Sequence, residues 1–166
     1  MVLNFPVGTV LHQAVPLKDI DFKKFFAELM AKAFTGYVVV TAEGFAGIEE
    51  GVFFFKGGFL CGSVFEFTNF DITFFGNVAL QQSFNAAAAE FGIMDVCELS
   101  KQQVELIAAF TEKIMLPEPI ALNAVSKFFR EKYDYGFSEK TLNEIVKKEE
   151  SRYDVFKKIG LPDIGK

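Results

Sequence analysis

The stretch Ile48–Phe67, with the sequence IEEGVFFFKGGFLCGSVFEF, constrains the fold of this chain more than any other segment. Two aromatic runs flank the pair Gly57-Gly58, and adjacent glycines accept the positive φ angles of a tight two-residue turn. The stretch therefore predicts a β-hairpin. Because Tyr37–Thr41 precedes it and is rich in β-branched residues, we expect three consecutive antiparallel strands.

Periodicity and capping residues predict the other elements before residue 120. They are a strand in Val7–Val15, a helix capped by Asp19 or Asp21 that runs to about Phe34, an ambiguous segment at Phe70–Phe75, a helix over Asn77–Glu90, a strand at Ile93–Leu99, and a helix from the capping box at Ser100 to about Met115, broken by Leu116–Pro119. The tail predicts three helices: about Ala121–Tyr133, one capped by Ser138, and about Glu150–Ile159, ended by Gly160.

This order of elements predicts an α+β fold: an antiparallel β-meander with helices packed on one face, followed by a C-terminal helical extension. A chain of 166 residues is too short for two full-sized domains. We expect a sheet domain over residues 1–116 and an extension over 120–166 that packs on it.

The turn positions predict the register of the hairpin. A two-residue loop places Lys56 opposite Phe59, so paired residue numbers sum to 115, and Glu43 opposite Ile48 gives a sum of 91 for the preceding pair. The first face of the sheet then carries Val38, Val40, Ala42, Gly51, Phe53, Phe55, Leu60, Gly62 and Val64, with Glu49 opposite Glu66 at its open end. The second face carries Val39, Val52, Phe54, Phe59, Phe65 and Phe67 among Tyr37, Thr41, Glu50, Lys56, Cys61 and Ser63.

Glycines inside a strand let another backbone approach, so Gly51 and Gly62 predict that the helices pack on the first face. The second face then needs a cover, which the C-terminal helices, a second copy of the chain or a ligand could supply. The interface candidates on it are Val39, Val52, Phe54, Phe59, Phe65 and Phe67.

We therefore expect a non-enzymatic protein-interaction or regulatory module that associates through this aromatic face, as a homodimer or with a protein partner. The alternative is a small-molecule or lipid carrier that uses the same surface as a pocket. An enzyme would need a site around Glu49 and Glu66, but no histidine, cysteine or lysine is placed beside them, and no catalytic residue is assigned.

The sequence contains no phosphate-cradling loop, dinucleotide fingerprint or nucleophile elbow, so no cofactor is expected. Two cysteines, Cys61 and Cys97, and one histidine, His12, make neither a zinc site nor a disulfide framework. The thiols are expected to be inert core groups in a reducing compartment.

Residues 1–99 contain 5 Lys and Arg against 11 Asp and Glu, so they are an unlikely surface for nucleic acid. The tail is mildly basic and leaves a weak possibility of nucleic-acid binding, although interspersed glutamates favour solvated helix faces with paired charges. No apolar run is long enough for a membrane span, and residues 1–18 lack the pattern of a secretion signal, so we expect a cytoplasmic protein.

Several short motifs resemble an uncharacterised archaeal family, domain of unknown function 2226. They are Phe34–Tyr37, Gly47–Gly51, Phe55–Gly58 with Gly62, Leu99-Ser100 with Gln103–Leu106, Ser151-Arg152, and Lys157–Gly160. More loosely, a strand, a turn and a strand ending in glycine and a small residue look like the non-catalytic PATAN signalling domain. The resemblance implies an archaeal cytoplasmic origin and no established activity or catalytic residues.

Overall fold

The computed structural model describes residues 5–158, and the chain divides into two compact units, Met1–Tyr133 and Asp134–Lys166. The strands are β1 (Thr9–Pro16), β2 (Gly36–Gly44), β3 (Gly47–Lys56), β4 (Phe59–Phe67), β5 (Ile72–Phe75), β6 (Gly92–Glu98) and β7 (Met115–Ile120). The α-helices are α1 (Phe22–Ala31), α2 (Gly76–Ala86), α3 (Lys101–Phe110), α4 (Leu122–Val125) and α5 (Tyr135–Lys158). Short 3₁₀ turns are η1 (Leu17–Asp19), η2 (Thr68–Phe70), η3 (Glu112–Ile114) and η4 (Ser126–Phe128).

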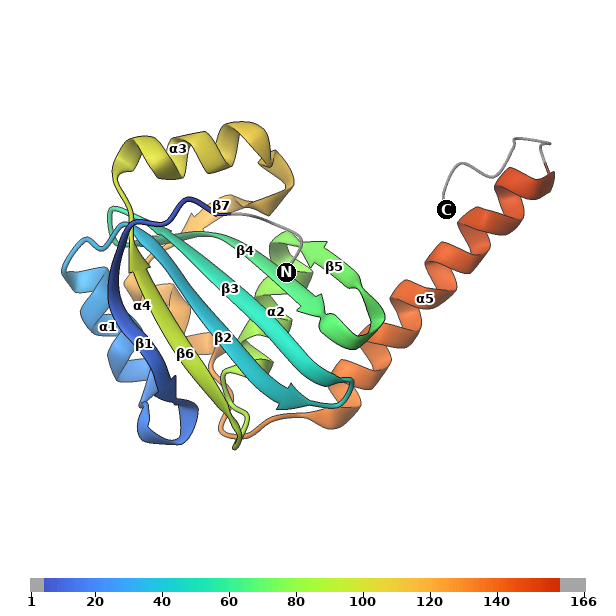
Figure 1. The fold of residues 1–166 in the computed structure, drawn as a ribbon, viewed down its shortest axis with the longest axis horizontal. Helices are drawn as coiled ribbons and strands as arrows, with labels where there is room; N and C mark the ends of the chain where they lie inside the picture. Colours follow the sequence, from blue (N-terminus) through green and yellow to red (C-terminus); the bar gives the residue numbers. More distant parts are fainter. Residues whose placement is uncertain (1–4, 159–166) are drawn as a thin grey trace. The chain divides into compact units, whose positions relative to one another are not determined.

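The described strands form one antiparallel sheet in the order β1-β6-β2-β3-β4-β5, and β7 pairs with β4 (Figure 1). The central meander β2-β3-β4 is the one that the sequence predicts. Gly57 and Gly58 have φ angles of 57° and 82°, as expected for their tight turn. The α+β fold class is therefore confirmed.

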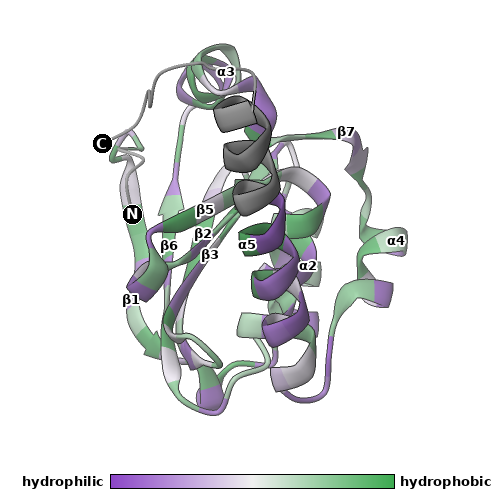
Figure 2. Cartoon of the chain, turned by 90° about the vertical axis from the view of Figure 1, so that its right-hand side faces the viewer, coloured by the Kyte–Doolittle hydropathy of each residue, from purple (hydrophilic) through white to green (hydrophobic). Residues whose placement is uncertain are grey.

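Helices α1, α2 and α4 lie on the first face of the sheet, and Figure 2 shows α2 and α4 on the same side of the strands. Aromatic side chains fill this layer. Phe26 of α1 is fully buried, and its ring centroid lies 5.0 Å from that of Phe53 and 5.2 Å from that of Phe55. It also contacts Phe84 and Phe129. The main core therefore lies between the first face and these helices.

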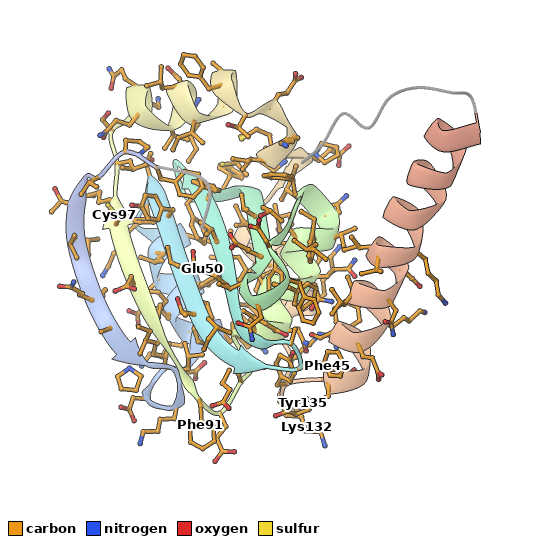
Figure 3. All side chains as sticks on the ribbon, turned by 45° about the vertical axis from the view of Figure 1, so that its right-hand side comes forward. Phe45, Glu50, Phe91, Cys97, Lys132 and Tyr135 are labelled. Atoms are coloured by element: carbon orange, nitrogen blue, oxygen red, sulfur yellow. The ribbon has the colours of Figure 1, made fainter. Side chains whose placement is uncertain are left out.

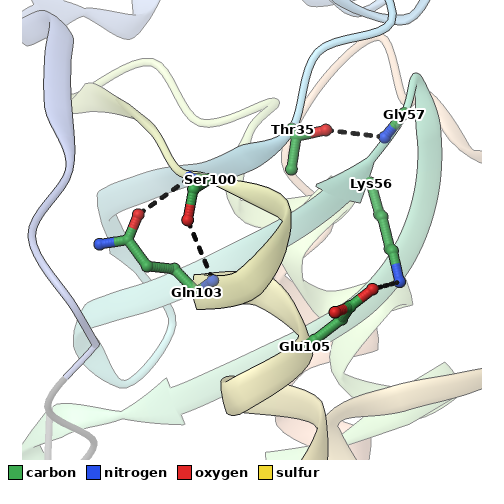
Figure 4. A network of polar contacts seen from close by, with 6 residues as sticks. All are labelled: Thr35, Lys56, Gly57, Ser100, Gln103 and Glu105. Carbon is green, nitrogen blue, oxygen red and sulfur yellow. Dashed lines mark hydrogen bonds and ion pairs between the residues drawn. The ribbon is translucent and has the colours of Figure 1, made fainter.

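Helix α3 crosses one end of the opposite, second face (Figure 1). Its capping box is formed as the sequence predicts, because Ser100 accepts from the N–H of Gln103 and the Gln103 side chain accepts from the N–H of Ser100. Lys56 of β3 binds Glu105 of α3 at 2.9 Å, as Figure 4 shows. The helix ends at Phe110, earlier than the expected Met115.

The register is partly as predicted. Every β2–β3 pair sums to 91, from Gly36 opposite Phe55 to Gly44 opposite Gly47. In the β3–β4 pair, the sum of 115 holds only for Lys56–Phe59 and Phe55–Leu60. One extra residue, Cys61, then forms a β-bulge, so the prediction for β4 beyond Cys61 is wrong by one residue.

The second unit is a single helix in its described part. The sequence predicts a helix start at Ser138 and a second helix from Glu150, but α5 is continuous from Tyr135, and Asp134 accepts from the N–H of Phe137 at 3.0 Å. Lys140 and Glu144 form an i,i+4 ion pair at 4.0 Å, in keeping with paired charges on solvated helix faces. The expected stop at Gly160 lies outside the described residues.

The segment between the two expected domains also differs from expectation. Residues 115–120 form strand β7, in which two prolines are tolerated because β7 pairs with β4 at only two positions. The expected helix Ala121–Tyr133 shortens to α4 and η4. Phe128 and Phe129 instead pack against Phe84 of α2, so tertiary contacts outweigh local helix propensity. This segment belongs to the first compact unit, which ends at Tyr133.

Candidate functional site

Because of the bulge at Cys61, the side chains of β4 beyond it lie on the face opposite to the predicted one. Phe65 lies opposite Gly51, and Ser63, on the same face, lies 3.2 Å from Ser83 of α2. A Cβ built on Gly51 would meet Ser83, whereas one on Gly62 would meet Ile114 of η3. Gly51 therefore admits a helix on the first face, as predicted, while Gly62 admits η3 on the second.

In the structure, the six interface candidates are divided between the two faces of the sheet. Val39, Val52, Phe54 and Phe59 lie on the second face, as predicted, but Phe65 and Phe67 lie on the first. Only Phe59 is well exposed, at 49%, and Val39 is half-buried. The other four are buried inside the chain, so this set does not form a continuous exposed aromatic surface.

The cover on the second face comes from the first unit itself. Val52, Phe54 and Val64 form a buried cluster with Val104, Ile107 and Ile114, to which Cys61, Cys97 and Leu99 also belong. Phe5, before β1, adds ring contacts to Tyr37 and Phe54. The region that the sequence offers as a pocket or interface is thus hydrophobic core at the α3 end.

The predicted pairing of Glu49 with Glu66 is wrong, because the bulge places them on opposite faces. Glu49 lies opposite Phe67, whereas Glu66 lies opposite Glu50. Both Glu49 and Glu66 are buried, so neither lies at a solvated end of the hairpin. Two carboxylates on opposite sides of a sheet cannot act together on one substrate.

Glu49 is held in a buried polar node on the first face. The hydroxyl of Tyr133 donates to its carboxylate, with distances of 2.7 Å to Oε1 and 2.9 Å to Oε2, and accepts from the N–H of Phe45 at 2.8 Å. The N–H of Ala46 donates to Oε1 at 3.4 Å. A Cβ on Gly44 would overlap this carboxylate. The node ties residue 133 to the β2–β3 turn.

The burial of Glu49 predicts a pH-dependent stability. Burial raises the pKa of Glu49 above 4.5, against the opposing hydrogen bonds of Tyr133, Ala46 and Phe45. Since the folded state then holds the proton more tightly than the unfolded chain, the stability contributed by this group is full below pH 4.5 and is lost as pH rises through the raised pKa. Glu49→Gln should flatten this fall, which is at most about 1.4 kcal/mol per pH unit for one group.

Urea unfolding of the wild type and Glu49→Gln between acidic and neutral pH measures the difference. Glu43→Gln, at an exposed position on the adjoining strand, is the matched control and should leave the slope unchanged. Glu50 shares the direction of the pKa shift, so part of the slope should remain in Glu49→Gln. A wild type that gains stability relative to Glu49→Gln as the pH rises would contradict this reading.

A second group of acids lies on the second face, beyond the part that α3 covers. Glu50 lies opposite Thr41 and Glu66, and Asp95 of β6 lies opposite Val39. Burial raises the pKa of Glu50, the positive charge of the N-terminal amino group lowers it, and the charges of Glu66 and Asp95 raise it further. Asp95 accepts from the N–H of Ala14 at 2.8 Å. Acidic side chains therefore occupy this half of the face.

Exposed apolar side chains lie beside these acids. Ile93 lies opposite Thr41, Ile48 lies opposite Glu43, and the N–H of Glu43 donates to the carbonyl of Phe91 at 3.0 Å. Ile48, Phe91 and Ile93 are 45%, 63% and 38% exposed. Figure 3 shows Phe91 at the end of the sheet remote from Cys97, with Glu50 between them. We call Ile48, Phe91 and Ile93 the sheet-end patch.

Both thiols are buried, as the sequence predicts. Burial raises the pKa of Cys61 to about 11, and its Sγ donates to the carbonyl of Phe54 at 3.3 Å. Cys97 accepts from the N–H of Gly8 at 3.2 Å. His12, on the exposed strand β1, packs edge-on against Phe25.

Two searches of the described residues were negative. In residues 5–158, no group of three or more histidine, cysteine, aspartate or glutamate side chains is arranged to hold a metal ion. No helix in that range combines the length and the apolar character needed to cross a membrane.

The family assignment rests on a match over most of the first unit. A family model described as an uncharacterised protein conserved in archaea, DUF2226, matches residues 3–111. The chain belongs to the DUF2226 family. No curated protein and no solved structure matches it. The matched part of this DUF2226 chain includes β1 to β6 and α3, hence all of the sheet-end patch.

Sequence reasoning missed several residues of this DUF2226 protein that matter for the site. Tyr133 lies 84 positions from Glu49, and Asp95 lies 81 positions from Ala14, so no local pattern connects them. Of the site residues, Ile93 could be placed on a strand from the sequence, because Ile93–Leu99 alternates in polarity. Its position next to β2, which brings Ile93 beside Thr41, does not follow from that alternation.

Proposed function

We propose that this DUF2226 protein is a non-enzymatic protein-interaction module whose binding surface is the sheet-end patch. One observation carries the proposal: Ile48, Phe91 and Ile93 are exposed at the same end of the sheet, on either side of Glu43 and Thr41 of β2 and away from the end that α3 covers. Exposed apolar side chains that gather at one place and are surrounded by polar groups are typical of interaction sites. The family match supplies no activity that would compete with this proposal.

A partner other than a second copy fits this surface better. A symmetric dimer places the same patch on both sides of its interface, which would bring Glu43, Glu50 and Asp95 of one copy toward those of the other. Like charges that face each other across an interface are unfavourable. The carrier alternative is also weakened, because Val52 and Phe54 already pack against α3.

Capture from an extract of the source organism tests the proposal. The variant Ile48→Thr/Phe91→Ser/Ile93→Thr removes the patch, and Val78→Thr/Leu106→Thr/Phe110→Ser makes the same kind of change at exposed positions elsewhere. We expect a protein that the immobilised wild type and the control retain and that the patch variant loses. Equal retention by all three, or no protein retained specifically by the wild type, would refute the proposal.

A further inference from the structure

The charged side chains on the strands of the sheet are almost all acidic. Among the strands in residues 5–158, Lys56 is the only lysine or arginine, and it is paired with Glu105 at the α3 end. At the other end of the second face the charged residues are Glu43, Glu50, Glu66 and Asp95. The charged strand residues around the sheet-end patch are therefore all acidic.

Apolar and acidic side chains alternate along the strands that carry the patch. Ile93 precedes Asp95 by two residues on β6, and Ile48 precedes Glu50 by two residues on β3. Residues two apart on a strand share a face and lie about 7 Å apart. Each strand thus presents an apolar group followed by a carboxylate. A ligand complementary to both strands needs an apolar group and a cation at a similar spacing.

The carboxylates beside the patch lie close enough to one another to interact. Asp95 receives the N–H of Ala14, a neutral donor, and Glu50 lies directly opposite another carboxylate, Glu66. Their mutual repulsion contributes to the raised pKa of Glu50. A bound cation would relieve this repulsion. Since the acids are not arranged to hold a metal ion within the described chain, lysine or arginine side chains are the complementary groups.

We infer that the sheet-end patch binds a basic amphipathic segment of another protein, in which lysine or arginine side chains alternate with apolar ones. The inference rests on the proposed function and names the chemistry of its partner. The apolar groups of the segment cover Ile48, Phe91 and Ile93. Its cations pair with Glu43, Glu50 and Asp95.

Titration with synthetic peptides tests the inference. The probes are a peptide of alternating lysine and leucine and one of alternating lysine and serine, and binding is measured by fluorescence anisotropy. The variant Glu43→Gln/Glu50→Gln/Asp95→Asn removes three charges at the patch, and the amide that replaces the Asp95 carboxylate can still accept from the N–H of Ala14. The control Glu28→Gln/Glu112→Gln/Glu118→Gln removes three exposed charges elsewhere. Thermal unfolding checks that both variants fold, and Glu43→Gln/Glu50→Gln replaces the triple variant if Asp95→Asn does not.

The lysine–leucine peptide should bind the wild type and the control with equal affinity. It should bind the Glu43/Glu50/Asp95 variant about tenfold more weakly, because each exposed ion pair contributes a few-fold to the affinity. The lysine–serine peptide should bind the wild type no more tightly than the lysine–leucine peptide binds the Glu43/Glu50/Asp95 variant. The inference would be overturned if the Glu43/Glu50/Asp95 variant and the control lost affinity equally, or if that variant kept the affinity of the wild type. It would also be overturned if the lysine–leucine peptide did not bind the wild type. If the extract partner is lost in the Ile48/Phe91/Ile93 variant but kept without the three acids, the proposed function stands and the basic partner fails.

Discussion

Insertion of one alanine between Ser63 and Val64 should abolish the native fold, whereas deletion of Cys61 and Cys61→Ala should both keep it. The insertion turns Phe65 and Phe67, which are now fully buried on the first face, toward the second face. The deletion removes only the extra residue of the bulge, so Leu60 still lies opposite Phe55 and Gly62 opposite Phe54. Cys61→Ala loses only a small buried thiol and its bond to the carbonyl of Phe54, which should cost about 1 to 2 kcal/mol.

Near-ultraviolet circular dichroism and thermal unfolding separate the variants. The insertion should give no cooperative transition, while the deletion and Cys61→Ala melt cooperatively below the wild type. An insertion variant that melts within a few degrees of the wild type would show that the pairing of β4 with β3 does not fix which of its side chains are buried.

Phe26→Ala should be the most damaging single side-chain truncation in the aromatic core. Phe26 is fully buried and contacts rings from β3, α2 and the segment after η4, so removing it leaves a cavity between several elements. Truncation of a buried Phe costs about 3 to 5 kcal/mol, and about 1 kcal/mol shifts the melting temperature by roughly 2 to 4 °C at this chain length.

Phe110→Ala is the matched control, because the same truncation is made at a side chain that is 82% exposed. It should change stability by no more than about 0.5 kcal/mol. Equal losses in the two variants by urea unfolding would contradict the assignment of the core to the first face.

The sequence predicts the meander well because its signals are local. Paired glycines specify the turn at residues 57 and 58, and β-branched and aromatic runs specify the strands, so the register with a sum of 91 holds along the whole of β2 and β3. The bulge is harder to predict. A glycine inside a strand marks either a close approach or a bulge, and Gly62 suggests the first while Cys61, beside it, forms the second.

The candidate site is less predictable, because long-range contacts build it. The alternation of β6 predicts a strand, but its pairing with β2, which completes the sheet-end patch, depends on topology. The cover of the second face by α3 is likewise invisible to local patterns, although the capping box at Ser100 marks where that helix begins. The family match and the looser likeness to PATAN add no residue roles, and the PATAN likeness stays a prediction.

The most direct test of the account is hydrogen–deuterium exchange of the wild type with and without the captured partner. The account predicts added protection in the β2–β3 turn around Ile48 and at the start of β6 around Phe91 and Ile93, with α3 unchanged. Protection confined to α3 or to α1, with these two segments unchanged, would contradict the sheet-end patch as the binding surface.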